Sequence, residues 1–139
     1  MGHIFKFLLL FFILTSCSTA SDSSIIKHDY SEIQDIQISY LDVFNQKEDE
    51  YYVYYYQTTC YYCHGIKSKI INYALNNPPF YFIGIVEDEG FLSHIKEETI
   101  GATDPLHAFS MMTPQLSLIK DRKVKETYIG VDEILNIIE

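Results

Sequence analysis

Glycine, proline and cysteine are scarce in this 139-residue sequence, which has six, four and three of them respectively. So little glycine and proline excludes a collagen-like chain and a long disordered chain. Basic residues are also few, since 10 Lys and Arg are set against 19 Asp and Glu, for a formal net charge of -9. Because no basic stripe could neutralise phosphates, we expect no nucleic acid partner. The length and 47% hydrophobic content predict one globular domain.

The first 20 residues have the pattern of a secretory signal. An apolar run over residues 7–14 follows a short polar start and precedes a series of small residues that ends at Ala20. The run is about half the roughly 20 residues that a membrane-spanning helix needs, so it is excluded from the fold. Ordinary signal-peptidase cleavage near Ala20 would leave an exported soluble domain.

The end of this signal resembles a bacterial lipobox. Leu14-Thr15-Ser16-Cys17 places a cysteine three residues after a leucine, and the cysteine of a lipobox is acylated and becomes the mature N-terminus. We therefore expect residues 1–16 to be a lipoprotein signal peptide that is removed, and residues 17–31 to be a tether lipidated at Cys17. Several acyl chains would anchor the protein to the bacterial cell membrane on its extracytoplasmic side.

Two apolar segments predict a pair of parallel strands joined by a helix. Residues 51–57 and 80–86 are rich in strand formers without alternation, which is typical of strands buried on both faces. Residues 61–76 place apolar side chains at helical spacing, and Pro78 and Pro79 follow them. A strand, a helix and a strand in this order form a βαβ unit.

The C-terminal part of the sequence predicts a hairpin and a helix. Residues 115–120 and 123–129 flank a two-residue turn, as antiparallel strands do, and Gly130 separates them from an amphipathic helix over residues 131–138. A βαβ unit followed by ββα predicts an α/β fold.

The remaining segments predict shorter elements. The isoleucines between residues 32 and 38 predict a short strand, and Ser39 predicts the cap of a helix that ends near residue 46. We expect a short helix within residues 90–98 and a loop over residues 99–112.

Two cysteines remain once Cys17 is assigned to the lipid. Cys60 and Cys63 lie three residues apart at the predicted start of a helix, where they share a face and can form a disulfide in an oxidising compartment. The unpaired N–H groups and the positive dipole at a helix N-terminus favour the thiolate, which is the attacking species. Cys60 is therefore the predicted nucleophile and Cys63 the resolving thiol. A disulfide that only fastens the start of the helix is the alternative.

In combination, these features resemble the thioredoxin superfamily over residues 32–139. A buried-type strand ends just before Cys60-Tyr61-Tyr62-Cys63, a helix starts at this motif, Thr113-Pro114 opens a later strand, and a hairpin and helix close the chain. The resemblance implies a thioredoxin-like fold with a central mixed sheet flanked by helices. It also implies a thiol–disulfide oxidoreductase that needs no cofactor.

The resemblance further assigns substrate-binding residues. Pro114 matches the family's cis-proline beside the cysteine pair, which would present the backbone of Thr113 to an extended substrate segment. Tyr61 and Tyr62, between the cysteines, are expected to be exposed and to contact substrate. The partners implied are the thiols and disulfides of exported proteins and a membrane redox partner, and we expect the chain to be a monomer.

Three departures from the family's pattern leave the direction of electron transfer open. Tyr54 stands six residues before Cys60, where the family often has a buried acid. Thr59 replaces the usual tryptophan, and Tyr61-Tyr62 replaces the usual Gly-Pro. The family's reduction potentials span about -270 to -120 mV, so the same fold serves reductants and oxidants.

The same motif has a second interpretation. Cys60-Tyr61-Tyr62-Cys63-His64 fits the C-x-x-C-H haem-attachment pattern, with Met111 or Met112 as a second axial ligand, and would define an electron-transfer lipoprotein. Against it, strand-like segments flank the motif, whereas small cytochromes c are mostly helical.

A metal site is a further alternative. A zinc site at Cys60, Cys63 and His64 would need a fourth ligand from among His28, His94 and His107, for which the sequence offers no support, so we expect no metal. With the cysteines in a redox role, His64 is either an ordinary helix residue or a group that tunes the thiolate.

Overall fold

The computed structural model describes residues 27–86 and 95–139. The expected signal peptide and lipidated Cys17 lie outside these residues. No helix in the two described ranges combines the length and the apolar character that crossing a membrane requires.

Four strands form one mixed sheet in the order β2-β1-β3-β4. β1 (Glu50–Tyr56) and β2 (Phe80–Gly84) run parallel, and α1 (Tyr61–Asn76) connects them. β3 (Gln115–Lys120) runs antiparallel both to β1 and to β4 (Lys123–Ile129), and α3 (Val131–Ile138) ends the chain. The predicted α/β fold, with a βαβ unit followed by ββα, is confirmed.

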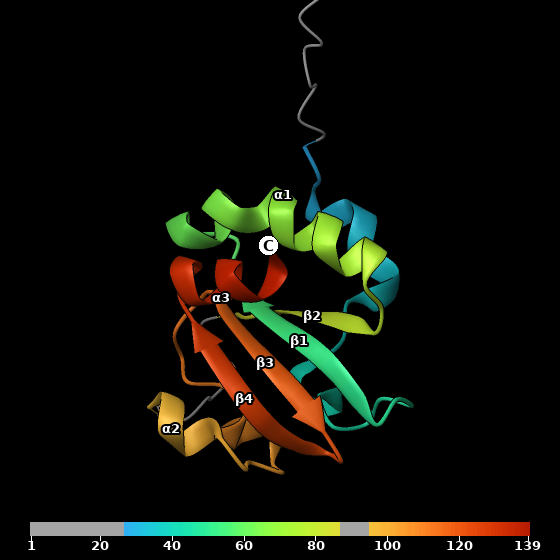
Figure 1. The fold of residues 1–139 in the computed structure, drawn as a ribbon, viewed down its shortest axis with the longest axis vertical. Coiled ribbons are helices and arrows are strands. Elements are labelled where there is room, and N and C mark those ends of the chain that lie inside the picture. The colour runs from blue at the N-terminus through green and yellow to red at the C-terminus, as the bar shows by residue number, and fades with distance from the viewer. Residues whose placement is uncertain (1–26, 87–94) are drawn as a thin grey trace, which may run out of the picture.

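β1 is buried on both faces of the sheet because it contributes to two cores. Tyr54 and Tyr56 pack against α1, α3 and the N-terminal segment, whereas Val53 and Tyr55 pack on the opposite face with Phe109. Successive side chains of a strand point to opposite faces. Burial on both sides therefore explains why residues 51–57 show no alternation. In Figure 1, α1 and α3 lie together on one side of the sheet.

α1 packs one apolar stripe onto the sheet. Its buried side chains include Ile66, Ile70, Ile71 and Ala74, whose spacing repeats at three and four residues. The helix ends at Asn76, before Pro78, since a proline lacks the N–H that would continue it and restricts the residue before it. The bounds of α1 are those that the sequence predicted.

The prediction of a strand over residues 32–38 is wrong. Residues Tyr30–Ile36 form the 3-10 helix η1. A capping box starts it: the Asp29 N–H donates to Glu32 Oε1 at 2.6 Å, and the Asp29 carboxylate accepts from the Ser31 N–H. Strand character is limited to an isolated parallel bridge between Gln37 and Phe82 of β2.

Other short elements also differ from the predictions. Ser39 accepts from the Leu41 N–H as expected, but the helix it caps, η2 (Tyr40–Asp42), is only a 3-10 turn. The helix α2 (Lys96–Thr99) occupies part of the predicted range 90–98, of which residues 90–94 lie outside the described chain. The predicted loop contains the 3-10 turn η3 (Pro105–His107), which Asp104 caps.

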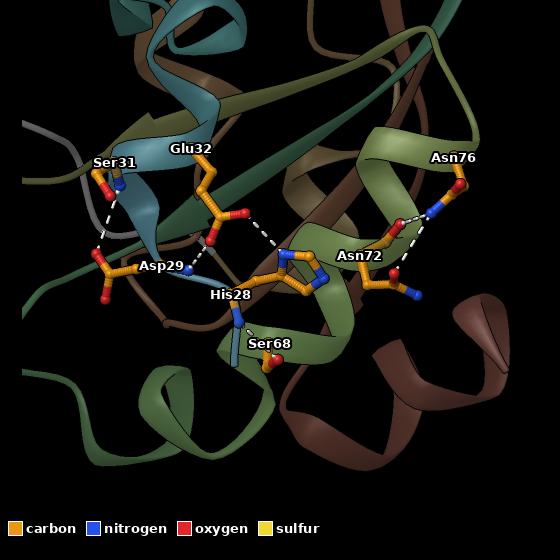
Figure 2. A network of polar contacts seen from close by, with 7 residues as sticks. All are labelled: His28, Asp29, Ser31, Glu32, Ser68, Asn72 and Asn76. Atoms are coloured by element: carbon orange, nitrogen blue, oxygen red, sulfur yellow. Dashed lines mark hydrogen bonds and ion pairs between the residues drawn. The ribbon is translucent and has the colours of Figure 1, made fainter. Parts of the chain in front are cut away.

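The segment before β1 is attached to α1. His28 donates its backbone N–H to Ser68 Oγ at 3.0 Å, and its ring Nδ1 lies 2.8 Å from Glu32 Oε2. Lys67 of α1 pairs with Asp29 at 2.6 Å. Figure 2 shows His28 between Glu32 and the side of α1 that bears Ser68, with Asn72 and Asn76 further along the helix. These contacts hold the start of the described chain against the helix that bears the cysteine motif.

Candidate active site

Cys60 and Cys63 form a disulfide at the N-terminus of α1, with their Cα atoms 5.2 Å apart. Cys60 is the N-cap residue, in an extended conformation, and Cys63 lies in the first turn of the helix. Cys60 is half-buried, whereas Cys63 is only 1% exposed. Of the two sulfurs, that of Cys60 is therefore the one that a partner protein can reach.

The helix start also provides an electrostatic site at Cys60. The backbone N–H of Cys63 donates to Cys60 Sγ at 3.1 Å, as a capping side chain accepts in other helices. In the reduced protein this N–H and the positive end of the dipole of the 16-residue helix would stabilise a Cys60 thiolate.

The loop before β3 lies against the cysteine motif. The carbonyl oxygen of Thr113 is 3.6 Å from Cys60 Sγ, and Thr113 Oγ1 donates to Gln57 Oε1 at 3.3 Å. The bond between Thr113 and Pro114 is cis. The antiparallel register pairs Tyr55 with Gln115, so the end of β1 and the start of β3 lie at the same edge of the sheet. Cys60, Cys63, Thr113 and Pro114 therefore lie close together at this end of the sheet.

Gln115 is a residue that the sequence analysis did not single out. Its amide is fully buried and makes four hydrogen bonds: it donates to the Ala108 carbonyl and to Ser117 Oγ, and it accepts from the N–H and the hydroxyl of Ser110. These bonds tie both ends of the loop that bears Thr113. The available signal was a glutamine at the first position of a predicted strand, directly after Pro114.

Large exposed side chains occur between the two cysteines and in the loop that leads to Thr113. Tyr61 and Tyr62 are 83% and 64% exposed, and their rings meet edge to face at 5.7 Å. Met111 and Met112, which precede Thr113, are 49% and 56% exposed. The tyrosines are thus exposed as predicted.

Tyr54 is a neutral group at the position where the thioredoxin superfamily often has a buried acid. Its side chain is fully buried in the same core cluster as Cys63. Burial, with a smaller contribution from nearby Tyr30, raises the pKa of Tyr54 far above its ordinary value. The Tyr54 hydroxyl has no hydrogen-bond partner among the described residues. Tyr54 therefore stays protonated and cannot act as a base for Cys63 at neutral pH.

The ring of His64 contacts the backbone before the motif. Its Nε2 lies 2.7 Å from the carbonyl oxygen of Thr58. His28 pairs with Glu32 on the N-terminal segment, and His107 lies 3.7 Å from Asp104 near η3. His94 lies outside the described residues. Across residues 27–86 and 95–139, no three His, Cys, Asp or Glu side chains are grouped to hold a metal ion.

The haem interpretation also conflicts with the fold. A C-x-x-C-H cytochrome was expected to be mostly helical, whereas the motif here joins a central β-strand to α1 of a mixed sheet. Both sulfurs that would bond to a haem are joined to each other.

The sheet order, the cysteine pair at the start of α1 and the proline loop beside it define a thioredoxin-like fold. Mitochondrial thioredoxin 3 from Saccharomyces cerevisiae superposes with a TM-score of 0.50 at 16% identity, over 73% of this chain and 88% of that chain. Thioredoxin f2 from Chlamydomonas reinhardtii superposes with a TM-score of 0.51 at 15% identity, over 74% and 92%. No protein-family model and no curated protein sequence matches the chain.

The protein therefore has the thioredoxin fold that the motifs implied. Such low identities establish the fold alone, so the chemistry rests on the chain's own residues. Together with this fold, the Cys60–Cys63 disulfide supports a thiol–disulfide oxidoreductase activity.

Proposed function

We propose that this protein is a membrane-tethered, extracytoplasmic thiol–disulfide oxidoreductase that exchanges disulfides with exported proteins through Cys60 and Cys63. One observation supports this most directly: at the N-terminus of α1 the two sulfurs are joined, and the accessible one lies against the Thr113 loop. A disulfide with a purely fastening role would close a loop too short to restrain much of the unfolded chain.

The exchange proceeds in two steps that conserve electrons and protons. The Cys60 thiolate attacks one sulfur of a substrate disulfide, forms a mixed disulfide and releases the other substrate sulfur as a thiolate, which takes up a proton. Cys63 then loses its proton, attacks the Cys60 sulfur and releases the second substrate thiolate. Two electrons pass to the substrate, and the cysteine pair is oxidised. In reverse, the same steps oxidise a substrate dithiol.

Backbone and side chains around Cys60 position the substrate in this proposal. The Thr113 backbone, beside Pro114, pairs with an extended substrate segment whose sulfur approaches Cys60. Tyr61 and Tyr62 contact the residues on either side of the substrate cysteine. Because Tyr54 is neutral, the proton that Cys63 gives up passes to solvent or to the departing substrate thiolate.

Export and anchoring are proposed from the N-terminal sequence. Cleavage before Cys17 and its acylation would tether the domain to the outer face of the cell membrane. There, exported proteins are the substrates, and a membrane dithiol or disulfide protein restores the cysteine pair after each turnover. Because His28 and Asp29 contact Ser68 and Lys67 of α1, such a tether would join the domain beside the helix that bears the cysteine motif.

Exchange activity is tested with the mature protein and its Cys60→Ser and Cys63→Ser variants. Reduction of a model disulfide by dithiothreitol and oxidation of a reduced, unfolded protein are both measured. We expect catalysis in at least one direction by the wild type, and mixed disulfides that accumulate only on Cys63→Ser. Equal rates for the wild type and Cys60→Ser would overturn the proposed activity.

Anchoring is tested separately in bacterial cells. The full chain should label with a radioactive fatty acid and sediment with membranes, whereas Cys17→Ser should do neither. A wild-type chain that is exported but unlabelled would overturn the lipid anchor and leave the exchange activity in place.

A further inference from the structure

We propose that a polar groove between the second half of α1 and the end of α3 binds a neutral saccharide. We call it the α1–α3 groove. It has a volume of about 450 Å³ and is lined by five residues between Lys69 and Asn77 and by Ile138 and Glu139. Ligand sites in proteins have volumes of about 300 to 1,000 Å³, so the groove is large enough to hold a sugar unit.

The α1–α3 groove lies toward the end of α1 that is remote from the cysteine motif. Asn72 follows Cys60 by 12 residues, which corresponds to about 18 Å along the axis of a helix. Figure 1 shows that α1 and α3 lie together on one side of the sheet, so both helices can contribute to one site. A ligand in this groove leaves Cys60 and Thr113 accessible, and the inference therefore does not depend on the exchange activity.

Two asparagine amides present oriented acceptors in the groove. Asn76 Nδ2 donates to the Asn72 carbonyl at 2.8 Å, and Asn77 Nδ2 donates to the Tyr73 carbonyl at 2.9 Å. These bonds fix both amides at the last turn of α1. An amide oxygen is an acceptor, and within the described residues neither the Asn76 nor the Asn77 Oδ1 accepts a hydrogen bond. Two acceptors thus remain for a ligand.

Asn72 supplies the complementary donor. Its Oδ1 lies 3.4 Å from Asn76 Nδ2, whereas its Nδ2 makes no hydrogen bond to any residue that the structure describes. Figure 2 shows the Asn72 amide with its oxygen toward Asn76 and its nitrogen away from it. The same groove therefore offers donors and acceptors. Sugars match this mixture, because every hydroxyl group can both donate and accept.

An aromatic ring and an aliphatic side chain complete the lining. Tyr73 is half-buried, and its ring meets that of Phe80 edge to face, with the centroids 6.0 Å apart. Ile138 of α3 lines the same groove. Aromatic side chains combine an apolar surface with a fixed geometry, onto which the C–H groups of a sugar ring can pack. The lining thus suits a ligand that has apolar faces and a polar edge.

The side chains of the groove carry no net charge. Its two charged residues, Lys69 and Glu139, form an ion pair with each other. A phosphate or carboxylate ligand would need a cation to form charge-assisted hydrogen bonds, and the cation in this groove already has a carboxylate partner. The three amides favour a neutral polar ligand instead.

Binding is tested by NMR on the oxidised, isotope-labelled mature protein with two neutral trisaccharides. Maltotriose offers hydroxyl groups, whereas tri-N-acetylchitotriose also offers acetamido groups, so the pair distinguishes recognition of hydroxyls from recognition of an amide. For at least one of them we expect a Kd of about 1 mM or tighter. The largest shifts should occur at the side-chain amides of Asn72, Asn76 and Asn77.

Substitutions identify the residues that hold the sugar. Asn72→Ala with Asn76→Ala removes a donor and an acceptor from exposed positions, and alanine favours the helix, so this variant should fold. We expect it to weaken binding at least tenfold. Tyr73→Leu keeps an apolar side chain but loses the ring, and it should weaken binding several-fold.

Asn45→Ala is the matched control. The exposed Asn45 amide also donates to the carbonyl four residues before it, that of Leu41 at 3.5 Å, but Asn45 does not line the groove. The Kd of this variant should equal that of the wild type. All variants are first checked for native circular dichroism.

The outcomes decide the inference without any turnover measurement. Spectra that neither trisaccharide changes at about 10 mM would overturn it, and so would shifts confined to residues away from the groove. Undiminished binding by the folded double variant, or equal weakening in Asn45→Ala, also overturns it. The exchange activity stands or falls separately, by the tests of Cys60 and Cys63.

Discussion

The carbonyl oxygen of Thr113 lies 3.6 Å from the sulfur of Cys60, although 53 residues separate them in the chain. The contact exists because β1 and β3 are antiparallel neighbours, so the segment that follows β1 meets the segment that precedes β3. The Cys60 sulfur also accepts the N–H of Cys63. Cys60 thus lies between a helix that favours its thiolate and a backbone segment that can hold a partner.

The two thiols should differ in reactivity. In Cys63→Ser, the remaining Cys60 should alkylate about tenfold faster at pH 7 than Cys63 does in Cys60→Ser, because only Cys60 accepts a helix N-terminal N–H and is accessible. Iodoacetamide labelling, followed by mass spectrometry across a pH series, measures both rates. Equal rates would contradict the assignment of Cys60 as the nucleophile.

Gln115→Leu should destabilise the protein by about 2 to 4 kcal/mol. The substitution leaves the Ser110 N–H and the Ala108 carbonyl without their partner in a buried place. Turnover of a peptide disulfide should also decrease, since the loop with Thr113 loses its attachment. Urea unfolding measures the stability, and exposed Gln34→Leu serves as the control with a change below about 0.5 kcal/mol. An unchanged unfolding midpoint for Gln115→Leu would contradict this account of the loop.

Tyr54→Phe should leave exchange activity intact and keep or raise stability. The hydroxyl it removes is buried without a partner among the described residues, so its loss relieves a desolvation cost of up to about 1 kcal/mol. Tyr54→Asp provides the contrast. Burial would raise the pKa of the new carboxyl. The stability of the Tyr54→Asp variant should therefore fall as the pH rises above about 4. Urea unfolding at several pH values and peptide turnover measure both effects. A large loss of turnover in Tyr54→Phe would indicate that the hydroxyl takes part in exchange.

Stability should decrease above about pH 10. Burial raises the pKa of Tyr55 and Tyr54 well above their ordinary value, and it raises that of Tyr51 to about 12. These groups keep their protons in the folded protein while they lose them in the unfolded chain. Their contribution to the free energy of unfolding is complete below the pKa of about 10 that they have in the unfolded chain. It is lost as the pH rises toward the pKa values that they have in the folded protein.

Between the unfolded and the folded pKa, each such tyrosine should lower the free energy of unfolding by about 1.4 kcal/mol per pH unit. Tyr55→Phe removes one of them, and the Tyr55 ring, which stacks on Phe109 at 5.1 Å, is replaced by one of nearly the same shape. Urea unfolding of the oxidised wild type and variant at pH 8 and pH 11 measures the difference. An identical pH dependence of the two proteins would rule out Tyr55 as a contributor.

Local patterns were sufficient to predict most of the fold. α1, β3, β4 and α3 have the predicted bounds, because each has a continuous period and ends at a proline, a tight turn or Gly130. The prediction of a strand over residues 32–38 failed because the isoleucines at 33 and 36 fit a helical turn as well as a strand. The local signal that decided between them was the capping box of Asp29 and Glu32.

The sequence by itself determined which chemistry the site can perform, since the spacing of Cys60 and Cys63 at a helix start is a local property. Tertiary structure alone decided what surrounds them. The contact between Thr113 and Cys60 depends on strands that are adjacent in the sheet but distant in the chain. Periodicity describes which face of an element is buried. It contains no information on which exposed residues of two remote segments meet, because that depends on how the whole sheet assembles.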